Sequence, residues 1–109
     1  MLTKVYTRSG RKCRVTFCVP PDIKASTVHL VGDFNDWSTC SHPLERQSDG
    51  SFSLTLKLKA GREYRFRYFI DGYRWTTDAG ADGAVTNQHN GLDSIVRLNN
   101  GKSRSTLNT

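Results

Sequence analysis

Apolar and polar side chains alternate with a period of two in five segments of this 109-residue chain. The alternating segments are 12–19, 27–32, 51–58, 62–71 and 94–98. A period of two is that of a β-strand with one buried face, and no ten-residue segment combines helical spacing with a cap. The pattern therefore predicts an all-β chain.

Short turn sequences separate these segments. Asp49-Gly50 and Asp71-Gly72 are dipeptides of the hairpin type, and Ala60-Gly61 lies between two alternating segments. Several short strands joined by such turns favour an antiparallel β-sandwich. We expect one domain over 12–98, preceded by an N-terminal extension at 1–11 and followed by a flexible polar tail at 99–109. Segments 34–48 and 73–93 lack alternation and are expected to be irregular loops.

The charge balance permits a polyanionic partner without requiring one. Sixteen Lys and Arg against ten Asp and Glu give a formal net charge of +6, which is also typical of a solvated basic surface. No apolar run approaches the ~18 residues of a membrane span, and the N-terminus has no secretory-type apolar stretch. We therefore expect a cytoplasmic protein without a membrane partner.

Catalytic and metal-binding motifs are missing from the sequence. No nucleophile elbow, zinc-protease helix or phosphate-binding loop occurs, and Cys40-x-His42 has no second pair at zinc spacing. The three cysteines are an odd set, and Cys13 and Cys18 would face opposite sides of one strand, which favours reduced thiols. We predict a protein that is not an enzyme, with no catalytic residues, cofactor or metal.

Two tryptophans follow turns and lie outside the alternation that would bury them. Trp37 follows a Gly-Asp-Phe-Asn turn and Trp75 follows Asp71-Gly72. In segment 62–71 the aromatic side chains at even positions face inward, so Arg67 faces outward on the strand that leads to Trp75. Flat rings beside a guanidinium suit sugars, which offer a C–H face for stacking and hydroxyls for hydrogen bonds. Tryptophans that merely cap the core are the alternative interpretation.

The same residues carry a resemblance to a known family. VHLVGDFNDW (28–37), DGSF (49–52) and YRFRYFIDGYRW (64–75), in this order, resemble the family 48 carbohydrate-binding module that binds glycogen and starch. That module precedes the catalytic barrel of isoamylases and branching enzymes, and it forms the glycogen-binding domain of the AMP-activated protein kinase beta subunit. The resemblance covers roughly 12–98. It implies an immunoglobulin-like early-set sandwich that binds α-1,4-linked glucans such as glycogen, starch and maltooligosaccharides.

The resemblance also implies carbohydrate-binding residues. Trp37 corresponds to a stacking platform, Arg67 to a position where the kinase module has Lys, and Trp75 to the second tryptophan. Trp75 follows Asp-Gly after two residues, where the kinase module has one. In the loop 86–94, His89 stands at the apolar position and Asp93 at the Asn position of glucan binders.

Two other functions compete with glucan binding. An early-set sandwich can bind protein, either by docking on a glucan-active enzyme or by pairing through a strand edge. Single-stranded nucleic-acid binding, suggested by the positive charge and by Arg65, Arg67 and Phe69 on one face, is the weakest hypothesis. We expect no nucleic-acid partner.

Overall fold

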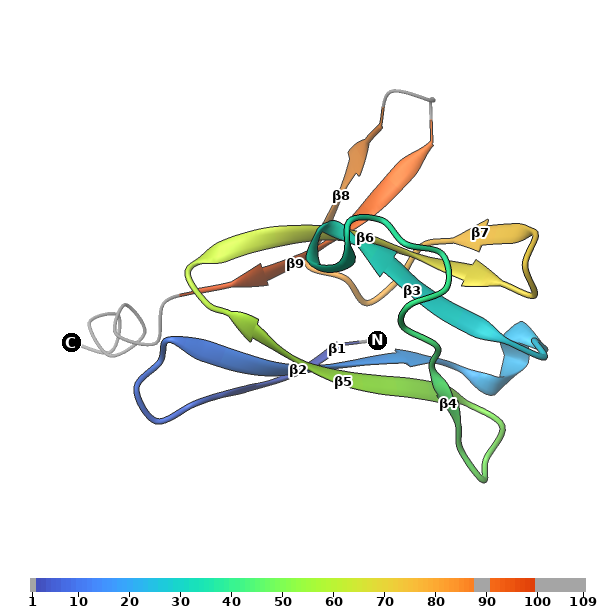
Figure 1. Cartoon of the computed structure of the whole chain (residues 1–109), viewed down its shortest axis with the longest axis horizontal. Helices are drawn as coiled ribbons and strands as arrows, with labels where there is room; N and C mark the ends of the chain where they lie inside the picture. Colours follow the sequence, from blue (N-terminus) through green and yellow to red (C-terminus); the bar gives the residue numbers. More distant parts are fainter. Residues whose placement is uncertain (1, 88–90, 100–109) are drawn as a thin grey trace.

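The computed structural model describes residues 2–87 and 91–99, which form two antiparallel β-sheets in two layers (Figure 1). The first sheet has the strand order β1-β2-β5-β4, with bounds Leu2–Tyr6, Lys12–Val19, Phe52–Lys59 and Glu45–Arg46. The second has the order β3-β6-β9-β8, with bounds Val28–Gly32, Arg62–Ile70, Leu92–Leu98 and Gly83–Thr86, and β7 (Arg74–Thr76) pairs with β6. Two 3₁₀ turns, η1 (Pro21–Ile23) and η2 (Asp33–Asn35), complete the described elements. The prediction of an all-β antiparallel sandwich is confirmed.

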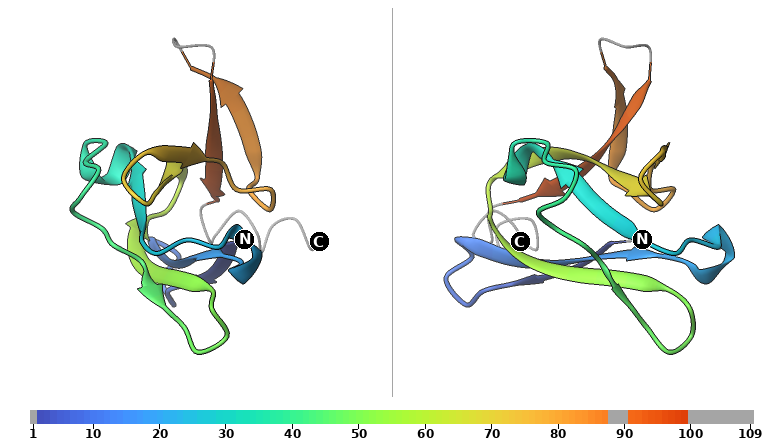
Figure 2. Two further views of the ribbon diagram at one scale, coloured as in Figure 1. Left: turned by 90° about the vertical axis from the view of Figure 1, so that its right-hand side faces the viewer. Right: turned by 45° about the vertical axis from the view of Figure 1, so that its right-hand side comes forward.

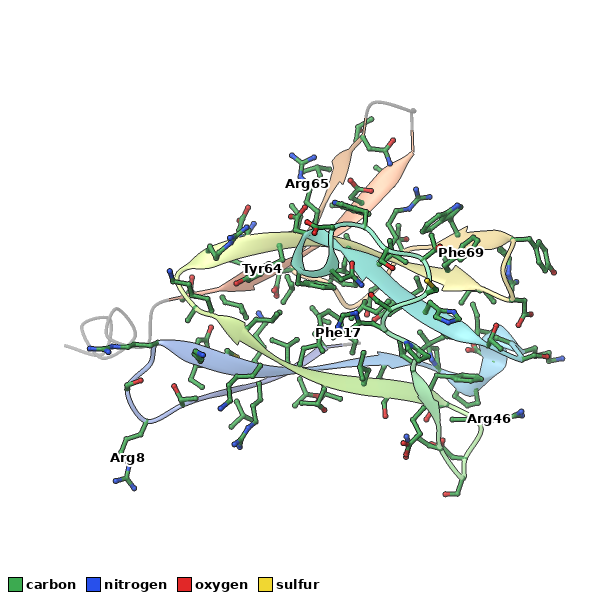
Figure 3. The ribbon with its side chains drawn as sticks, viewed as in Figure 1. Arg8, Phe17, Arg46, Tyr64, Arg65 and Phe69 are labelled. Atoms are coloured by element: carbon green, nitrogen blue, oxygen red, sulfur yellow. The ribbon has the colours of Figure 1, made fainter. Side chains whose placement is uncertain are left out.

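The core lies between the inner faces of the two sheets, where the alternation placed it. Phe17 of β2 and Phe66 of β6 are fully buried, and their ring centres lie 5.1 Å apart in an edge-to-face contact. Phe17 also contacts Phe34 of η2, which anchors the chain that leads to Trp37. Figure 3 shows Phe17 and Tyr64 between the layers, with Arg65 on the outer side of β6. Successive residues of β6 therefore either fill the core or face the outer surface.

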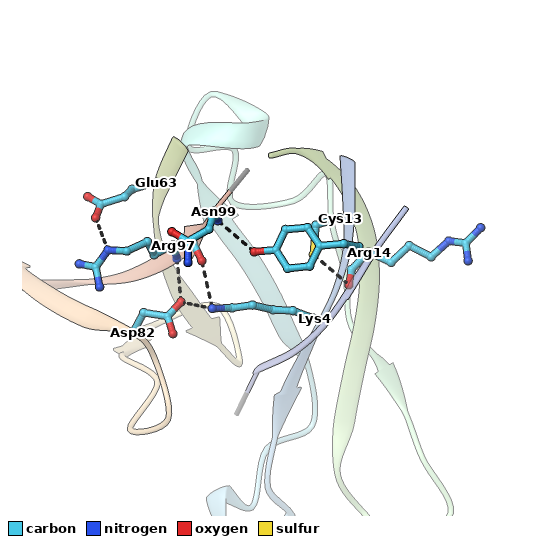
Figure 4. A network of polar contacts seen from close by, with 8 residues as sticks. Lys4, Cys13, Arg14, Glu63, Asp82, Arg97 and Asn99 are labelled. Carbon is cyan, nitrogen blue, oxygen red and sulfur yellow. Dashed lines mark hydrogen bonds and ion pairs between the residues drawn. The ribbon is translucent and has the colours of Figure 1, made fainter. Parts of the chain in front are cut away.

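One strand lies inside the segment that the sequence assigned to an extension. Residues 2–6 form β1, an edge strand paired with β2. The pattern hid this strand because Lys4 occupies an inward position. Lys4 Nζ crosses to the other sheet, where it lies 2.6 Å from Asp82 Oδ2 and donates to the carbonyl of Arg97 (Figure 4). The Asn99 N–H donates to the Tyr6 hydroxyl, so β1 joins the two sheets.

The expectation of irregular structure over 34–48 and 73–93 is partly wrong. β4, β7 and β8 lie in these segments, and they contain two, three and four residues. Strands this short carry too few residues for a periodic signal, and their pairing partners fix them instead. Both views of Figure 2 show the β8–β9 hairpin rising from its layer away from the other sheet.

The described residues also bear on the predictions about disulfides, membrane spans and metal sites. Within the described residues, Cys13, Cys18 and Cys40 form no disulfide bond. No helix in the described ranges has the length and apolar character to cross a membrane, and these ranges hold no group of three or more metal-ligating side chains.

Candidate functional site

The loop that follows β3 holds Trp37 outward from the second sheet. The Asn35 side chain accepts from the Gly32 N–H and donates to the Leu30 carbonyl, at 3.0 and 2.9 Å. Asp36 and Trp37 both have left-handed backbone conformations, with φ of 54° and 58°. The Trp37 N–H then donates back to the Gly32 carbonyl at 2.9 Å. This closed turn orients Trp37 and leaves the residue 36% exposed.

Asp33 fixes the orientation of the indole ring. Trp37 Nε1 donates to Asp33 Oδ1 at 3.1 Å, and the backbone N–H of Arg65 donates to Asp33 Oδ2 at 2.8 Å. One carboxylate thus ties the tryptophan to the middle of β6. Because its ring N–H is already engaged, Trp37 offers a ligand mainly its exposed ring surface.

Gly32 allows the loop to lie against β6. A Cβ atom at this position would lie 2.4 Å from the Arg65 carbonyl oxygen and 2.9 Å from Phe66 Cβ. Those atoms belong to the backbone and to the root of a core side chain, so they cannot move aside cheaply. The close approach that places Asp33 beside the Arg65 N–H therefore requires glycine.

Arg67 lies between Trp75 and Asp93, two further residues that the sequence predicts for the site. Its guanidinium carbon is 4.7 Å from the centre of the Trp75 ring, on one side, and its Nε is 4.0 Å from Asp93 Oδ1 on the other. Four ångströms is an ion-pair distance and too long for a hydrogen bond. The Nε atom is buried and has no hydrogen-bond partner among the described residues. A ligand hydroxyl is an acceptor that would satisfy this donor.

Trp75 is placed by the hairpin between β6 and β7. Asp71 and Gly72 both have positive φ, 54° and 78°, as in the tight turns that match strand twist. Asp71 Oδ1 accepts from the N–H groups of Ser26 and Thr27, and these bonds, that of Thr27 first, hold the pKa of Asp71 below its usual value. Trp75 packs on Phe69 with ring centres 4.4 Å apart, and 39% of its surface stays exposed.

The β8–β9 hairpin supplies the polar wall of the site. Asp93 is buried at the start of β9, and its Oδ1 accepts from Asn87 Nδ2 at 3.2 Å. The Asn87 backbone N–H donates to the carbonyl of Gly91, which closes the hairpin. His89 lies outside the described residues, so its predicted role stays a prediction.

These side chains line an open cavity of about 580 Å³. Its lining residues are Asp33, Trp37, Arg65, Arg67, Thr86, Asn87 and Asp93. Three of the predicted residues, Trp37, Arg67 and Asp93, therefore share one cavity, and Trp75 lies just beyond Arg67. Two guanidinium groups face two carboxylates here, so the formal charge is zero and favours an uncharged ligand.

The sequence reasoning did not assign four residues that line the cavity. Arg65 could have been found, because it is two residues from Arg67 on the same outer face of β6. Asp33 gave no such signal, because its position depends on the bond from the Arg65 N–H, 32 residues along the chain. Thr86 and Asn87 gave none, because the short β8–β9 hairpin that carries them leaves no periodic pattern.

Comparison with known families identifies the module. Residues 21–104, about three-quarters of the chain, match the family model described as the glycogen recognition site of AMP-activated protein kinase. The chain belongs to this family. The resemblance drawn from the motifs is confirmed, and with it the assignment to a family of non-catalytic glycogen- and starch-binding modules.

Curated relatives of this glycogen-recognition module are much longer proteins. Protein PTST homolog 2, chloroplastic, of Arabidopsis thaliana is 38% identical over 72 residues, which are 66% of this chain and 13% of that protein. Protein FLOURY ENDOSPERM 6, chloroplastic, of Oryza sativa subsp. japonica is 43% identical over 54 residues, 50% of this chain and 10% of the relative. A 1,4-alpha-glucan-branching enzyme of Dictyostelium discoideum is 57% identical over 39 residues, 36% and 6% of the two chains. The chain thus spans between 6% and 13% of these three relatives.

Proposed function

We propose that this module binds α-1,4-linked glucans, such as glycogen, starch and maltooligosaccharides, on the outer face of the second sheet. The observation that carries the proposal is the buried Nε of Arg67, which has no hydrogen-bond partner among the described residues and lies in a cavity beside Trp37. A sugar ring stacked on the indole brings hydroxyl groups to the guanidinium. The sugar ring covers the apolar face of the Trp37 indole, and its hydroxyls accept from the buried Arg67 donor. In a partly enclosed site, water hydrates this donor less well than it would on an open surface.

The second tryptophan extends this site. Trp75 lies on the far side of Arg67, with its ring supported by Phe69. A glucan of several residues would contact Trp37 in the cavity and Trp75 beyond it. Asp93 and Asn87, joined by a hydrogen bond, offer further polar groups to the sugar edge.

The expected affinity is weak for a single short glucan. A stack that hides ~100 Å² of apolar surface contributes about 2.5 kcal/mol at ~25 cal/mol per Å². Two stacks and a few hydrogen bonds, less the entropy of association, give a dissociation constant of roughly tens of µM to mM. Such binding becomes effective on a polymer, where many sites are available.

The module is proposed to act without catalysis of its own. The branching enzyme of Dictyostelium discoideum matches over only 6% of its length. The two carboxylates of the cavity already accept hydrogen bonds within the chain, Asp33 from Trp37 and Arg65, and Asp93 from Asn87. Association with a glucan-metabolising protein is a further proposal, supported by the relative that is named as a 1,4-alpha-glucan-branching enzyme. The cytoplasmic location stays a prediction, since two relatives are named as chloroplastic.

Co-sedimentation with glycogen tests the proposed function. The double variant Trp37→Ala and Trp75→Ala is expected to remain in the supernatant instead of sedimenting with glycogen, because both stacking surfaces are removed. Tyr73→Ala serves as a matched control, since Tyr73 is 75% exposed and lies outside the site. Retention of the folded double variant at the level of the unchanged protein would refute the site and favour the protein-interaction alternative.

A further inference from the structure

The outer face of the first sheet carries two pairs of like charges in direct register. Lys12 lies opposite Lys59, and Arg14 lies opposite Lys57, on the neighbouring strands β2 and β5. All four side chains are exposed, because they alternate with buried residues on their strands. Figure 4 shows Arg14 extending from the side of the sheet opposite to Lys4. We call these four residues the basic face.

Like charges directly opposite each other destabilise a sheet. Side chains in such pairs have Cβ atoms about 5 Å apart, and residues two apart along a strand are separated by about 6.8 Å. Fold stability therefore does not account for this arrangement. A solvated basic surface would be expected to place these charges apart or to intersperse them with acids.

No acidic side chain of this chain neutralises the basic face. Among the strands of this sheet, Glu45 is the only acidic residue, and it lies opposite Ser53, six residues along β5 from Lys59. Within residues 2–87 and 91–99, the ammonium and guanidinium groups of these four residues form no ion pair and no hydrogen bond, and the hydrogen bonds of Lys12 and Arg14 to neighbouring side chains use backbone atoms. The remaining residues, 1, 88–90 and 100–109, contain no Asp or Glu. Acidic groups that pair with these exposed cations would have to belong to another polypeptide segment.

We propose that the basic face, formed by the cross-strand pairs Lys12–Lys59 and Arg14–Lys57, docks an extended acidic polypeptide. An extended chain presents alternate side chains to one side at a repeat of about 6.8 Å. Carboxylates at every second residue would thus meet the cations of one strand in step. Ammonium and guanidinium groups suit carboxylates as charge-assisted donors.

The neighbouring side chains favour a polypeptide over other polyanions. Thr16 and Thr55, whose hydroxyls are hydrogen-bonded at 2.8 Å, continue the face along the strands, and Val5 lies beside Arg14 on β1. The strands present no aromatic ring on this outer face, and single-stranded nucleic acids are held by base stacking. Of the large exposed apolar residues in the described part of the chain, only Val5 lies on this sheet, which is little surface for insertion into a membrane.

The basic face and the glucan site lie on opposite sides of the sandwich. The cations project from the first sheet, whereas Arg65, Arg67 and Phe69 project from the second, with the core between the layers (Figures 1 and 3). The two ligands therefore do not compete for surface. If both surfaces are occupied at once, the module brings an acidic protein segment close to a glucan.

Fluorescence anisotropy of a labelled peptide of alternating Glu and Ser, titrated with the full chain at low salt, tests this proposal. Lys57→Glu is expected to raise the dissociation constant by about tenfold or more, since it removes one charge contact and adds repulsion. Lys24→Glu, an equal change at the exposed end of η1, is expected to change the dissociation constant less than about threefold, which reflects long-range charge alone.

The same Lys57→Glu variant is expected to raise the unfolding temperature, because it places an acid opposite Arg14.

Three outcomes would overturn the proposal. The first is equal loss of peptide binding in Lys57→Glu and Lys24→Glu, which would reduce the effect to net charge. The second is the absence of peptide binding to the unchanged protein at low salt. The third is a preference for oligothymidine or for vesicles with anionic lipids over the peptide, which would assign the face to another class of partner. An excess of maltoheptaose is expected to leave peptide binding unchanged.

Discussion

At the scale of single residues, Asp33 decides where the exposed indole points. It joins Trp37 Nε1 to the backbone of β6 through its two carboxylate oxygens. We expect Asp33→Ala to weaken maltoheptaose binding by about 2- to 10-fold, the equivalent of one hydrogen bond of ~0.5–1.5 kcal/mol. Isothermal titration calorimetry measures this change. Asp36→Asn is the control, because Asn tolerates the left-handed backbone and Asp36 is exposed. Equal affinities for the two variants would contradict the positioning role.

A second residue-scale prediction concerns the close contact at Gly32. Gly32→Ala is expected to lower the free energy of unfolding by about 1–3 kcal/mol, because the new Cβ overlaps the Arg65 carbonyl and the loop must move. Urea denaturation measures the loss. Gly83→Ala is the matched control, since its Cβ would meet only ordinary contacts of 3.8 Å or more. A Gly32→Ala protein as stable as the control variant would refute the close-approach argument.

Residue positions inside regular strands could be predicted from the sequence, and positions set by loops could not. The alternation placed Arg67 outward and Phe66 inward, because a strand has only two sides. It could not bring Asp93 to within 4.0 Å of Arg67, because that distance depends on where β9 begins and on which strand it pairs with. Asp33 was missed for the same reason.

At the scale of elements, the Asp71 carboxylate holds the β6–β7 hairpin against the start of β3. Its pKa is lowered by the N–H groups of Thr27 and Ser26, so the folded state favours the ionised form. The resulting stability is present above the unfolded pKa of about 3.9 and is lost as the pH falls through the lower folded value. We expect Asp71→Asn, which keeps an acceptor oxygen but cannot ionise, to show a flatter decline in unfolding temperature below about pH 4.

Thermal unfolding followed by circular dichroism at several pH values between about 2 and 7 makes this comparison. Asp49 has its pKa lowered by the Ser51 hydroxyl and N–H, so it adds a second acid-sensitive contact that remains in the Asp71→Asn variant. Identical pH profiles for the variant and the unchanged protein would exclude Asp71 as a source of acid sensitivity.

The elements that sequence reasoning found and missed differ in length and in what stabilises them. β2 was predicted with its observed bounds, 12–19, and β5, β6 and β9 were predicted to within two residues. β2, β5 and β6 each bury one apolar face, and β9 buries four successive residues, Asp93 to Val96. β1 was missed because Lys4 occupies an inward position to reach Asp82, and β7 because its three residues pair only with one end of β6. Tertiary contacts fix both strands, and a local pattern does not record them.

At the scale of the whole molecule, the sandwich separates two surfaces of different charge. The outer face of the second sheet carries the formally neutral cavity with Trp37 and Arg67, and the outer face of the first carries the four unpaired cations. The net charge of +6 therefore does not describe the glucan site. Binding of an uncharged glucan should respond little to salt, while binding at the basic face should weaken steeply.

The most direct test of glucan binding is the intrinsic tryptophan fluorescence during titration with maltoheptaose, with cellohexaose as the control. Both tryptophans, Trp37 and Trp75, are partly exposed in or beside the site, so we expect a stacked sugar to change their emission. We predict a saturable change with maltoheptaose, half complete between roughly tens of µM and mM, and no saturation with cellohexaose. No change with maltoheptaose up to ~10 mM would contradict glucan binding at this face.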